Sequence, residues 1–310
     1  MSIRQSITSV LLLLLGVCVS GCSTEERVER IVFTSDRGGD YEIHISRTDG
    51  SGLKRVTHYE SDDMEPNLAP DGRIVFYANR DGDFEIYAIN IDGTGLDQLT
   101  DNTSSDLHPA WSPDGRKIAF LRSSFWGSYD VYIMNRDGTG QVNITNSPET
   151  EYWVNWSPDG QKVAFSKTVD GNSDIYSINR DGTGLQRLTT DPAYDRAPSW
   201  APDGTRLAFH SDMNAVSGSN HIYIMNSDGS GLTEITSGFY DYEPTWSPNG
   251  RQLAFTRSGY GISDITIINL DGSDGYYLTE AAGHNSCPDW KRILITKDRN
   301  GVGVLSWEQY

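Results

Sequence analysis

The chain has 310 residues, including 31 glycines, 16 tyrosines and 8 tryptophans, and carries a formal net charge of −18 at pH 7. Its 36% of hydrophobic residues argues against wholesale disorder, and its glycine and aromatic content favours short strands and turns over helices. The acidic balance argues against binding of nucleic acid or of anionic membrane surfaces, which both need a basic face, and favours neutral or basic partners.

The N-terminus has the features of an export signal. The apolar run Val10–Val19 is too short to span a bilayer as a helix, but it fits the hydrophobic region of a signal peptide. It ends in Val-Ser-Gly-Cys at 19–22, which resembles the lipobox of bacterial lipoproteins. The resemblance implies that residues 1–21 are removed, that Cys22 is lipidated and that 22–29 form a polar tether. The alternative is an ordinary secretory signal with a chance cysteine.

The rest of the chain, 30–310, is built from one repeat. An Asp-Gly-x-x-Gly turn, or a near variant of it, recurs every 43 to 47 residues. A period of this length is typical of repeat folds. The turns begin at Asp49, Asp92, Asp137, Asp181, Asp228 and Asp271.

Each repeat unit predicts four short strands. In the unit around Trp111, a strand ending in Leu99-Thr100 is followed by a polar loop, an acidic residue and a Pro-x-Trp strand. A Trp-Ser-Pro-Asp-Gly turn at 111–115 comes next, since proline and glycine there suit a tight turn. The apolar strands around 118–120 and 131–132 complete the unit. Strands that are apolar on both faces indicate a blade packed between two other blades.

This repeat resembles the WD40-like repeat of the TolB β-propeller family over about residues 30–290. The resemblance implies an all-β propeller of four-stranded blades, because an open blade cannot bury both of its faces. The first unit lacks a Pro-x-Trp strand, and the chain supplies an extra one at 288–290. Closure of the ring by that strand predicts six blades in a single domain, 30–310. The alternative is that 291–310 begin a seventh, incomplete blade.

In this topology, the loops before the Pro-x-Trp strands lie at one end of the central channel. The residue before the proline differs from unit to unit, which a shared turn requirement does not explain. We therefore predict that Glu65, His108, Trp153 and Glu243 form a partner-binding site at the channel mouth. The repeated acidic position adds four more candidates, although these side chains could instead accept backbone hydrogen bonds in a turn. They are Asp63, Asp106, Asp195 and Asp241.

The motifs of common enzymes are absent from the sequence. It has no Gly-x-Ser-x-Gly elbow, no P-loop and no dinucleotide fingerprint, and its six histidines show no zinc-binding spacing. We therefore expect a monomeric, non-catalytic envelope lipoprotein that needs no cofactor or metal and binds a protein or peptide.

The lipid anchor would be its only membrane contact. It would lie on the periplasmic face of the outer membrane in a Gram-negative cell, and otherwise at the cell surface. The alternative is a propeller that binds or cleaves envelope poly- or oligosaccharides in a lyase-like way, with or without a metal, and uses Trp153 to stack on sugar.

Overall fold

A computed structural model describes residues 24–124, 127–214, 218–237, 239–259, 261–280, 283–297 and 303–304. The proposed signal peptide and Cys22 lie outside these ranges. All regular elements within them are β-strands. In this part of the chain, no helix has the length and apolar character needed to cross a membrane.

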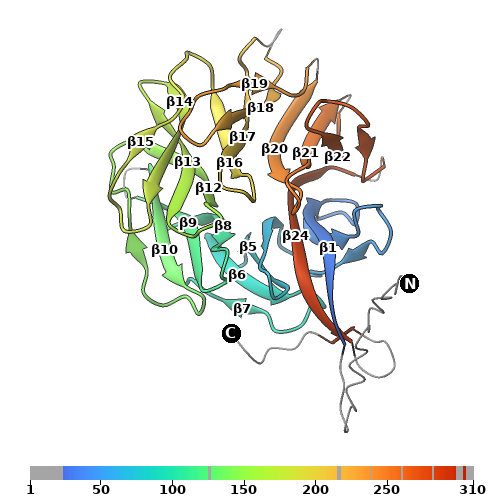
Figure 1. Cartoon of the computed structure of the whole chain (residues 1–310). Helices are drawn as coiled ribbons and strands as arrows, with labels where there is room; N and C mark the ends of the chain where they lie inside the picture. The colour runs from blue at the N-terminus through green and yellow to red at the C-terminus, as the bar shows by residue number, and fades with distance from the viewer. Residues whose placement is uncertain are drawn as a thin grey trace, which may run out of the picture.

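The described strands form six antiparallel sheets, which stand as blades around a central axis (Figure 1). Blade 1 contains β24 (Asn285–Lys297), β1 (Thr24–Ser35), β2 (Glu42–Ser46) and β3 (Lys54–Arg55), with β25 (Gly303–Val304) beside β24. Blade 2 contains β4 (Asp63–Leu68), β5 (Arg73–Asn79), β6 (Phe84–Asn90) and β7 (Asp97–Gln98). Blade 3 contains β8 (Asp106–Trp111), β9 (Lys117–Ser123), β10 (Tyr129–Asn135) and β11 (Val142–Asn143).

The other three blades repeat this order. Blade 4 contains β12 (Thr150–Trp156), β13 (Lys162–Val169), β14 (Asn172–Asn179) and β15 (Gln186–Arg187). Blade 5 contains β16 (Asp195–Trp200), β17 (Arg206–Ser211), β18 (His221–Asn226) and β19 (Thr233–Glu234). Blade 6 contains β20 (Tyr240–Trp246), β21 (Gln252–Gly259), β22 (Ile262–Asn269) and β23 (Tyr276–Tyr277). The predicted six-bladed propeller is confirmed.

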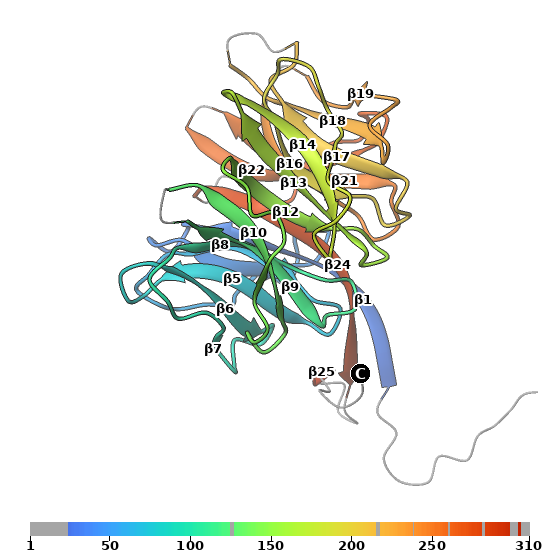
Figure 2. The same cartoon turned by 90° about the vertical axis from the view of Figure 1, so that its left-hand side faces the viewer.

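The ring closes inside blade 1, where β24 from the end of the chain pairs with β1 from its start. Ile31 lies opposite Trp290 in this pair, as the extra Pro-x-Trp strand predicts. The two strands continue beyond the blades as a ribbon, in which Thr24–Arg30 pair with Lys291–Lys297 (Figure 2). The segment expected as a tether is thus strand from Thr24 onwards. The start of the tail continues β24, and no seventh blade occurs in the described residues.

The core lies between the blades. One phenylalanine in the second strand of every blade is fully buried, because the neighbouring blades cover both faces of that strand. Two of the repeat tryptophans also connect blades, since Trp156 Nε1 donates to the carbonyl of Ala110 and Trp246 Nε1 to that of Ser199. The buried phenylalanines are Phe33, Phe76, Phe120, Phe165, Phe209 and Phe255.

The repeated Asp-Gly turn also depends on contact between blades. Gly138 has a φ of +83°, and a Cβ atom there would lie 2.3 Å from the carbonyl oxygen of Leu99 in blade 2. Only glycine fits such a close approach at positive φ. The repeat period thus marks where one blade touches the next.

Candidate functional site

Every inner strand is bulged at the same aligned position, which precedes a proline in five blades and Val154 in blade 4. In β4, for example, the register with β5 shifts between Met64 and Asn67. All six of these residues have left-handed backbones, with φ between 48° and 55°, although none is glycine. This conformation costs on the order of 1–2 kcal/mol per residue, and a bulge changes the direction of its side chain. The six residues are Glu65, His108, Trp153, Ala197, Glu243 and Cys287.

Side chains of the preceding blades hold these bulges in place. Thr34 Oγ1 accepts the backbone N–H of Glu65 at 3.0 Å, and Ser166 Oγ accepts that of Ala197 at 3.1 Å. Thr256 Oγ1 accepts the backbone N–H of Cys287 at 3.1 Å. The strained backbone is therefore fixed by contacts that exist only when the blades are assembled into a ring.

The six bulges surround a cavity of about 110 Å³ on the propeller axis. Each blade contributes three consecutive residues, the bulged one and the two that follow it, and the second is a proline in every blade except blade 4, where it is Val154. The predicted residues Glu65, His108, Trp153 and Glu243 all line this cavity. The structure therefore brings them together, while their role in binding a partner stays a prediction.

Aromatic and histidine rings form one side of the cavity wall. The His108 ring lies 5.4 Å from that of Trp153 and 6.0 Å from that of Tyr77, measured between centroids. His108 Nδ1 also lies in close contact with Glu65 Oε2. Tyr77 completes this group, because its hydroxyl lies 3.4 Å from Glu65 Oε1. Burial, followed by the charge of Glu65, raises the pKa of Tyr77, so its hydroxyl keeps its proton as a donor.

The opposite side of the cavity is acidic. Glu243 Oε2 accepts the backbone N–H of Cys287 and the Thr256 hydroxyl, both at 3.0 Å. Burial raises the pKa of Glu243, and the nearby charge of Glu65 raises it further. Burial and these same two carboxylates raise the pKa of the Cys287 thiol well above its usual value, so this cysteine is not an activated nucleophile.

His210 packs against Trp153 behind the cavity wall without lining the cavity itself, and the sequence analysis missed it. It lies on β17, and its Nδ1 accepts the backbone N–H of Glu243 at 3.3 Å. Its ring packs edge-on against the rings of Trp153 and Tyr242. Burial, with a smaller effect of Arg196, lowers the pKa of His210 to about 3, so the ring is neutral and can accept this bond.

Replacing His210 tests whether it holds the bulge of blade 6. His210→Phe is expected to lower the free energy of unfolding at pH 8 by about 1–3 kcal/mol, because the buried N–H of Glu243 loses its acceptor. His210→Gln retains an acceptor and should cost less. Urea unfolding of both variants measures the difference, and equal losses would contradict this role.

The acidic positions belong to a different environment from the cavity. They are fully buried and do not line it. Asp106 accepts two bonds from Arg122 at 2.7 and 2.6 Å, and Asp241 accepts two from Arg257 at 2.7 and 2.9 Å. Each carboxylate thus joins the first two strands of its own blade, and contact with a partner remains a prediction for them. The buried set is Asp63, Asp106, Glu151, Asp195 and Asp241.

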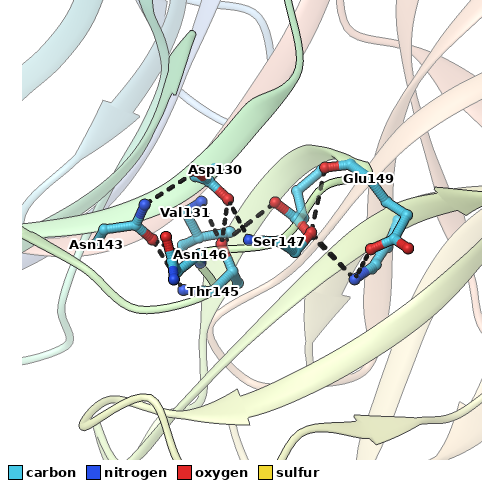
Figure 3. Close-up of polar contacts among 9 residues, drawn as sticks. Asp130, Val131, Asn143, Thr145, Asn146, Ser147 and Glu149 are labelled. Carbon is cyan, nitrogen blue, oxygen red and sulfur yellow. Dashed lines mark hydrogen bonds and ion pairs between the residues drawn. The ribbon is translucent and has the colours of Figure 1, made fainter. Parts of the chain in front are cut away.

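Buried carboxylates also meet where blades adjoin. Between blades 3 and 4, the Thr145 hydroxyl lies 3.2 Å from both Asp130 Oδ1 and Glu151 Oε2 (Figure 3). Ser147 donates its N–H to Asp130 at 2.9 Å and its hydroxyl to Glu151 at 2.6 Å. Burial, with a contribution from Asp130, raises the pKa of Glu151 to about 7. These bonds fix the loop that leads into β12.

Asp195 in blade 5 lacks the cation that its counterparts have. Asp106 and Asp241 lie opposite arginines in the strand register, whereas Asp195 lies opposite Ser211. Neither Asp195 oxygen forms a hydrogen bond of standard geometry. Burial raises the pKa of Asp195 to about 7, although the hydroxyls of Ser211 and Thr189 offset part of the shift. In the described residues, no three His, Cys, Asp or Glu side chains are grouped to hold a metal ion.

Fold and cavity together define a six-bladed β-propeller whose axis is lined by one bulged residue from each blade, of five different residue types. The family of the TolB beta propeller domain matches residues 64–154 and 139–307. These matches extend over more than half of the sequence, so the chain belongs to the TolB β-propeller domain family. A comparison with curated proteins finds no match.

Solved structures show the same fold in several settings. TolB from Acinetobacter baumannii aligns with a TM-score of 0.74 and 21% identity over 84% of this chain and 66% of that chain. A putative TolB from Agrobacterium tumefaciens aligns with a TM-score of 0.68 and 21% identity over 87% of this chain and 99% of the other. A chain of a nidogen/laminin complex aligns with a TM-score of 0.69 and 12% identity over 84% of this chain and 98% of that chain. At these identities the likeness concerns the fold alone.

Proposed function

We propose that this chain is an exported lipoprotein whose axial cavity binds a protein or peptide of the cell envelope without catalysing a reaction. One observation carries the proposal. Six bulges with nearly the same backbone angle present six positions to one cavity, yet the side chains differ in charge, size and aromaticity. Strained conformations of this kind cluster at binding sites. Variable side chains on a constant backbone suit recognition of one particular partner.

Membership of the TolB β-propeller family supports a place in the cell envelope. The lipobox-like sequence that ends at Cys22 supports a lipid anchor, on the periplasmic face of an outer membrane or on the cell surface. We further propose that the protein is a monomer and that the anchor is its only contact with the membrane. Since one acyl chain gives only marginal membrane binding, stable attachment would need several chains on Cys22.

Cross-linking in the native envelope tests the function. The wild type is compared with the triple variant Glu65→Ala/His108→Ala/Glu243→Ala and with Ala197→Trp. The latter fills the cavity without removing a polar group. Ala197 has nearly the same φ as Trp153, so this backbone accommodates a tryptophan. Asp92→Ala, in an exposed turn, is the control. A partner captured by the wild type should fall at least tenfold in both cavity variants and persist in the control.

The other outcomes contradict parts of the proposal. A partner that both cavity variants retain would place the binding site elsewhere on the propeller. Capture of no partner at all would contradict protein binding. In the same membranes, the Cys22→Ser variant is expected in the soluble fraction, and its retention in the membrane fraction would contradict the lipid anchor.

A second candidate function, binding of an envelope oligosaccharide, is favoured by one observation. The ring of Trp153 lies in the cavity wall beside that of His108. The face of an aromatic ring exposed in this way can stack on a sugar. Binding to a glycan panel that is lost on Trp153→Ala would favour this function over protein binding.

A further inference from the structure

The charge lining the cavity is unbalanced. Glu65 of blade 2 and Glu243 of blade 6 flank Cys287 of blade 1, and no lysine or arginine is among the described residues that line the cavity. Glu65 contacts His108, but Glu243 contacts no cationic side chain in the described part of the chain. A pair of carboxylates at a half-buried site is electrostatically costly unless a cation joins them.

Glu243 is already oriented for a further donor. The Thr256 hydroxyl and the Cys287 N–H both donate to Oε2, and the Cys287 thiol also interacts with this carboxyl group. Each carboxylate oxygen has two lone pairs, so Oε1 can accept a further hydrogen bond. A flat guanidinium binds best when it meets both oxygens of a carboxylate, whereas an ammonium group binds as a point charge through single bonds. The occupied Oε2 therefore favours an ammonium group over a guanidinium.

The rest of the wall would strengthen such a contact. The rings of His108 and Trp153 lie side by side in the cavity wall, His210 packs against Trp153 from behind, and only 19% of the Glu65 side chain is exposed to water. Charge interactions are stronger where water is excluded. Arg196 lies 6.0 Å from the Trp153 ring centroid, so a cation is already close to that ring. The attraction for a second cation must therefore come from the carboxylates.

The size of the cavity limits what can enter. About 10–15 Å³ of such space holds one water molecule, so a cavity of about 110 Å³ holds several waters or the end of one side chain. A whole strand or helix does not fit. The net charge of −18 would also attract a partner that carries basic residues.

We propose that the cavity receives the ammonium group of one lysine side chain of the protein partner, between the carboxylates of Glu65 and Glu243. This inference rests on the proposed function, because it names the group by which the partner would be recognised. The Glu243 carboxylate would accept a hydrogen bond from the ammonium group, and Glu65 would add its charge from the neighbouring side.

Short peptides test this chemistry directly on the full-length mature protein. Acetylated and amidated Gly-Lys-Gly, Gly-Arg-Gly and Gly-Gln-Gly are titrated calorimetrically, together with Gly-Gly-Gly-amide, whose amino terminus is free. We expect the lysine peptide to bind at least tenfold more tightly than the glutamine peptide. Glu243→Gln should abolish this preference, and the control Glu60→Gln, at an exposed position outside the cavity, should keep it.

Several outcomes would overturn the inference. One is equal binding of the lysine and glutamine peptides to the wild type. Another is a Glu243→Gln variant that keeps the preference while melting at the wild-type temperature. If the peptide with a free amino terminus binds more tightly than the lysine peptide, the group recognised is a chain terminus and not a lysine side chain. If the arginine peptide binds more tightly, the group recognised is a guanidinium.

Envelope cross-linking separates this inference from the function on which it rests. If the wild type captures no protein, the proposed function fails whatever the peptides do. Only the ammonium inference fails if the wild type captures a partner that the triple variant loses but the Glu243→Gln variant retains fully.

Discussion

The Asp195→Asn variant is expected to be more stable than the wild type at pH 8, by up to about 4 kcal/mol. Asp195 is fully buried and lies opposite a serine, and no cation among the described residues pairs with its charge. Its pKa is about 7 in the folded state, against about 3.9 in an unfolded chain. Each unit of this difference corresponds to 1.36 kcal/mol, which sets the upper limit for the gain.

The sign of the pH dependence follows from proton binding. Between about pH 4 and pH 7 the folded protein binds a proton at Asp195 that the unfolded chain has lost, so stability falls as the pH rises through this range. Asparagine carries no charge and is free of this cost. The advantage of the variant should therefore be largest at pH 8 and nearly vanish at pH 4, which urea unfolding at several pH values measures.

The matched control is the same substitution in the next blade. Asp241→Asn is expected to destabilise the protein by about 3–5 kcal/mol, because Arg257 loses a paired carboxylate that accepts two hydrogen bonds. The two variants differ only in whether an arginine faces the altered side chain. A loss of stability at pH 8 in both would contradict the assignment of Asp195 as an uncompensated charge.

Removing the closing strand is expected to abolish cooperative unfolding. A chain that ends at residue 284 lacks β24, and with it the fully buried Ile293 and the buried Trp290. It also loses Asp289, whose Oδ2 accepts the N–H of Leu68 in blade 2 at 2.7 Å. The open blade would expose its strand edge, and the lost contacts would exceed the roughly 5–15 kcal/mol by which a typical protein is stable.

Calorimetry and binding of a hydrophobic dye measure this effect. The control chain ends at Lys297 and keeps all of β24, so we expect it to unfold in one transition. Adding a peptide of residues 283–297 to the shorter chain should restore part of that transition. An unchanged cooperative transition in the shorter chain without the peptide would show that the ring does not depend on β24.

The fold could be predicted from the sequence because the repeat carries it. The Asp-Gly turns mark the contacts between blades, as at Gly138, and the extra Pro-x-Trp strand at 288–290 indicates how the ring closes. The extent of β24 was less predictable. Its continuation beyond Trp290 depends on pairing with residues 24–30 at the other end of the chain, and no local pattern specifies that pairing.

The candidate site was predictable only in part. Variation before the proline marked four residues that line the cavity, but nothing in the sequence shows the left-handed bulge that brings them there. His210 could not be recognised, because its counterparts in other blades include Thr34, Ser166 and Thr256, so the repeat shows no histidine at this position. The sequence does contain a signal, overlooked in its analysis, that these acidic residues are buried in pairs with cations. A basic residue follows Asp106 and Asp241 by 16 positions, and Ser211 stands at that distance from Asp195.

The ribbon that β1 forms with β24 has a mechanical consequence for a lipid-anchored chain. A partner that pulls on the cavity would transmit its force to the anchor through the start of β1. That force would run along the strand, whereas the hydrogen bonds to β24 lie across it. The whole ladder from Thr24 to Ser35 would then bear the load in shear, rather than opening one bond at a time. The propeller could thus stay attached under a tension that would separate the two strands if it acted across them, along the hydrogen bonds.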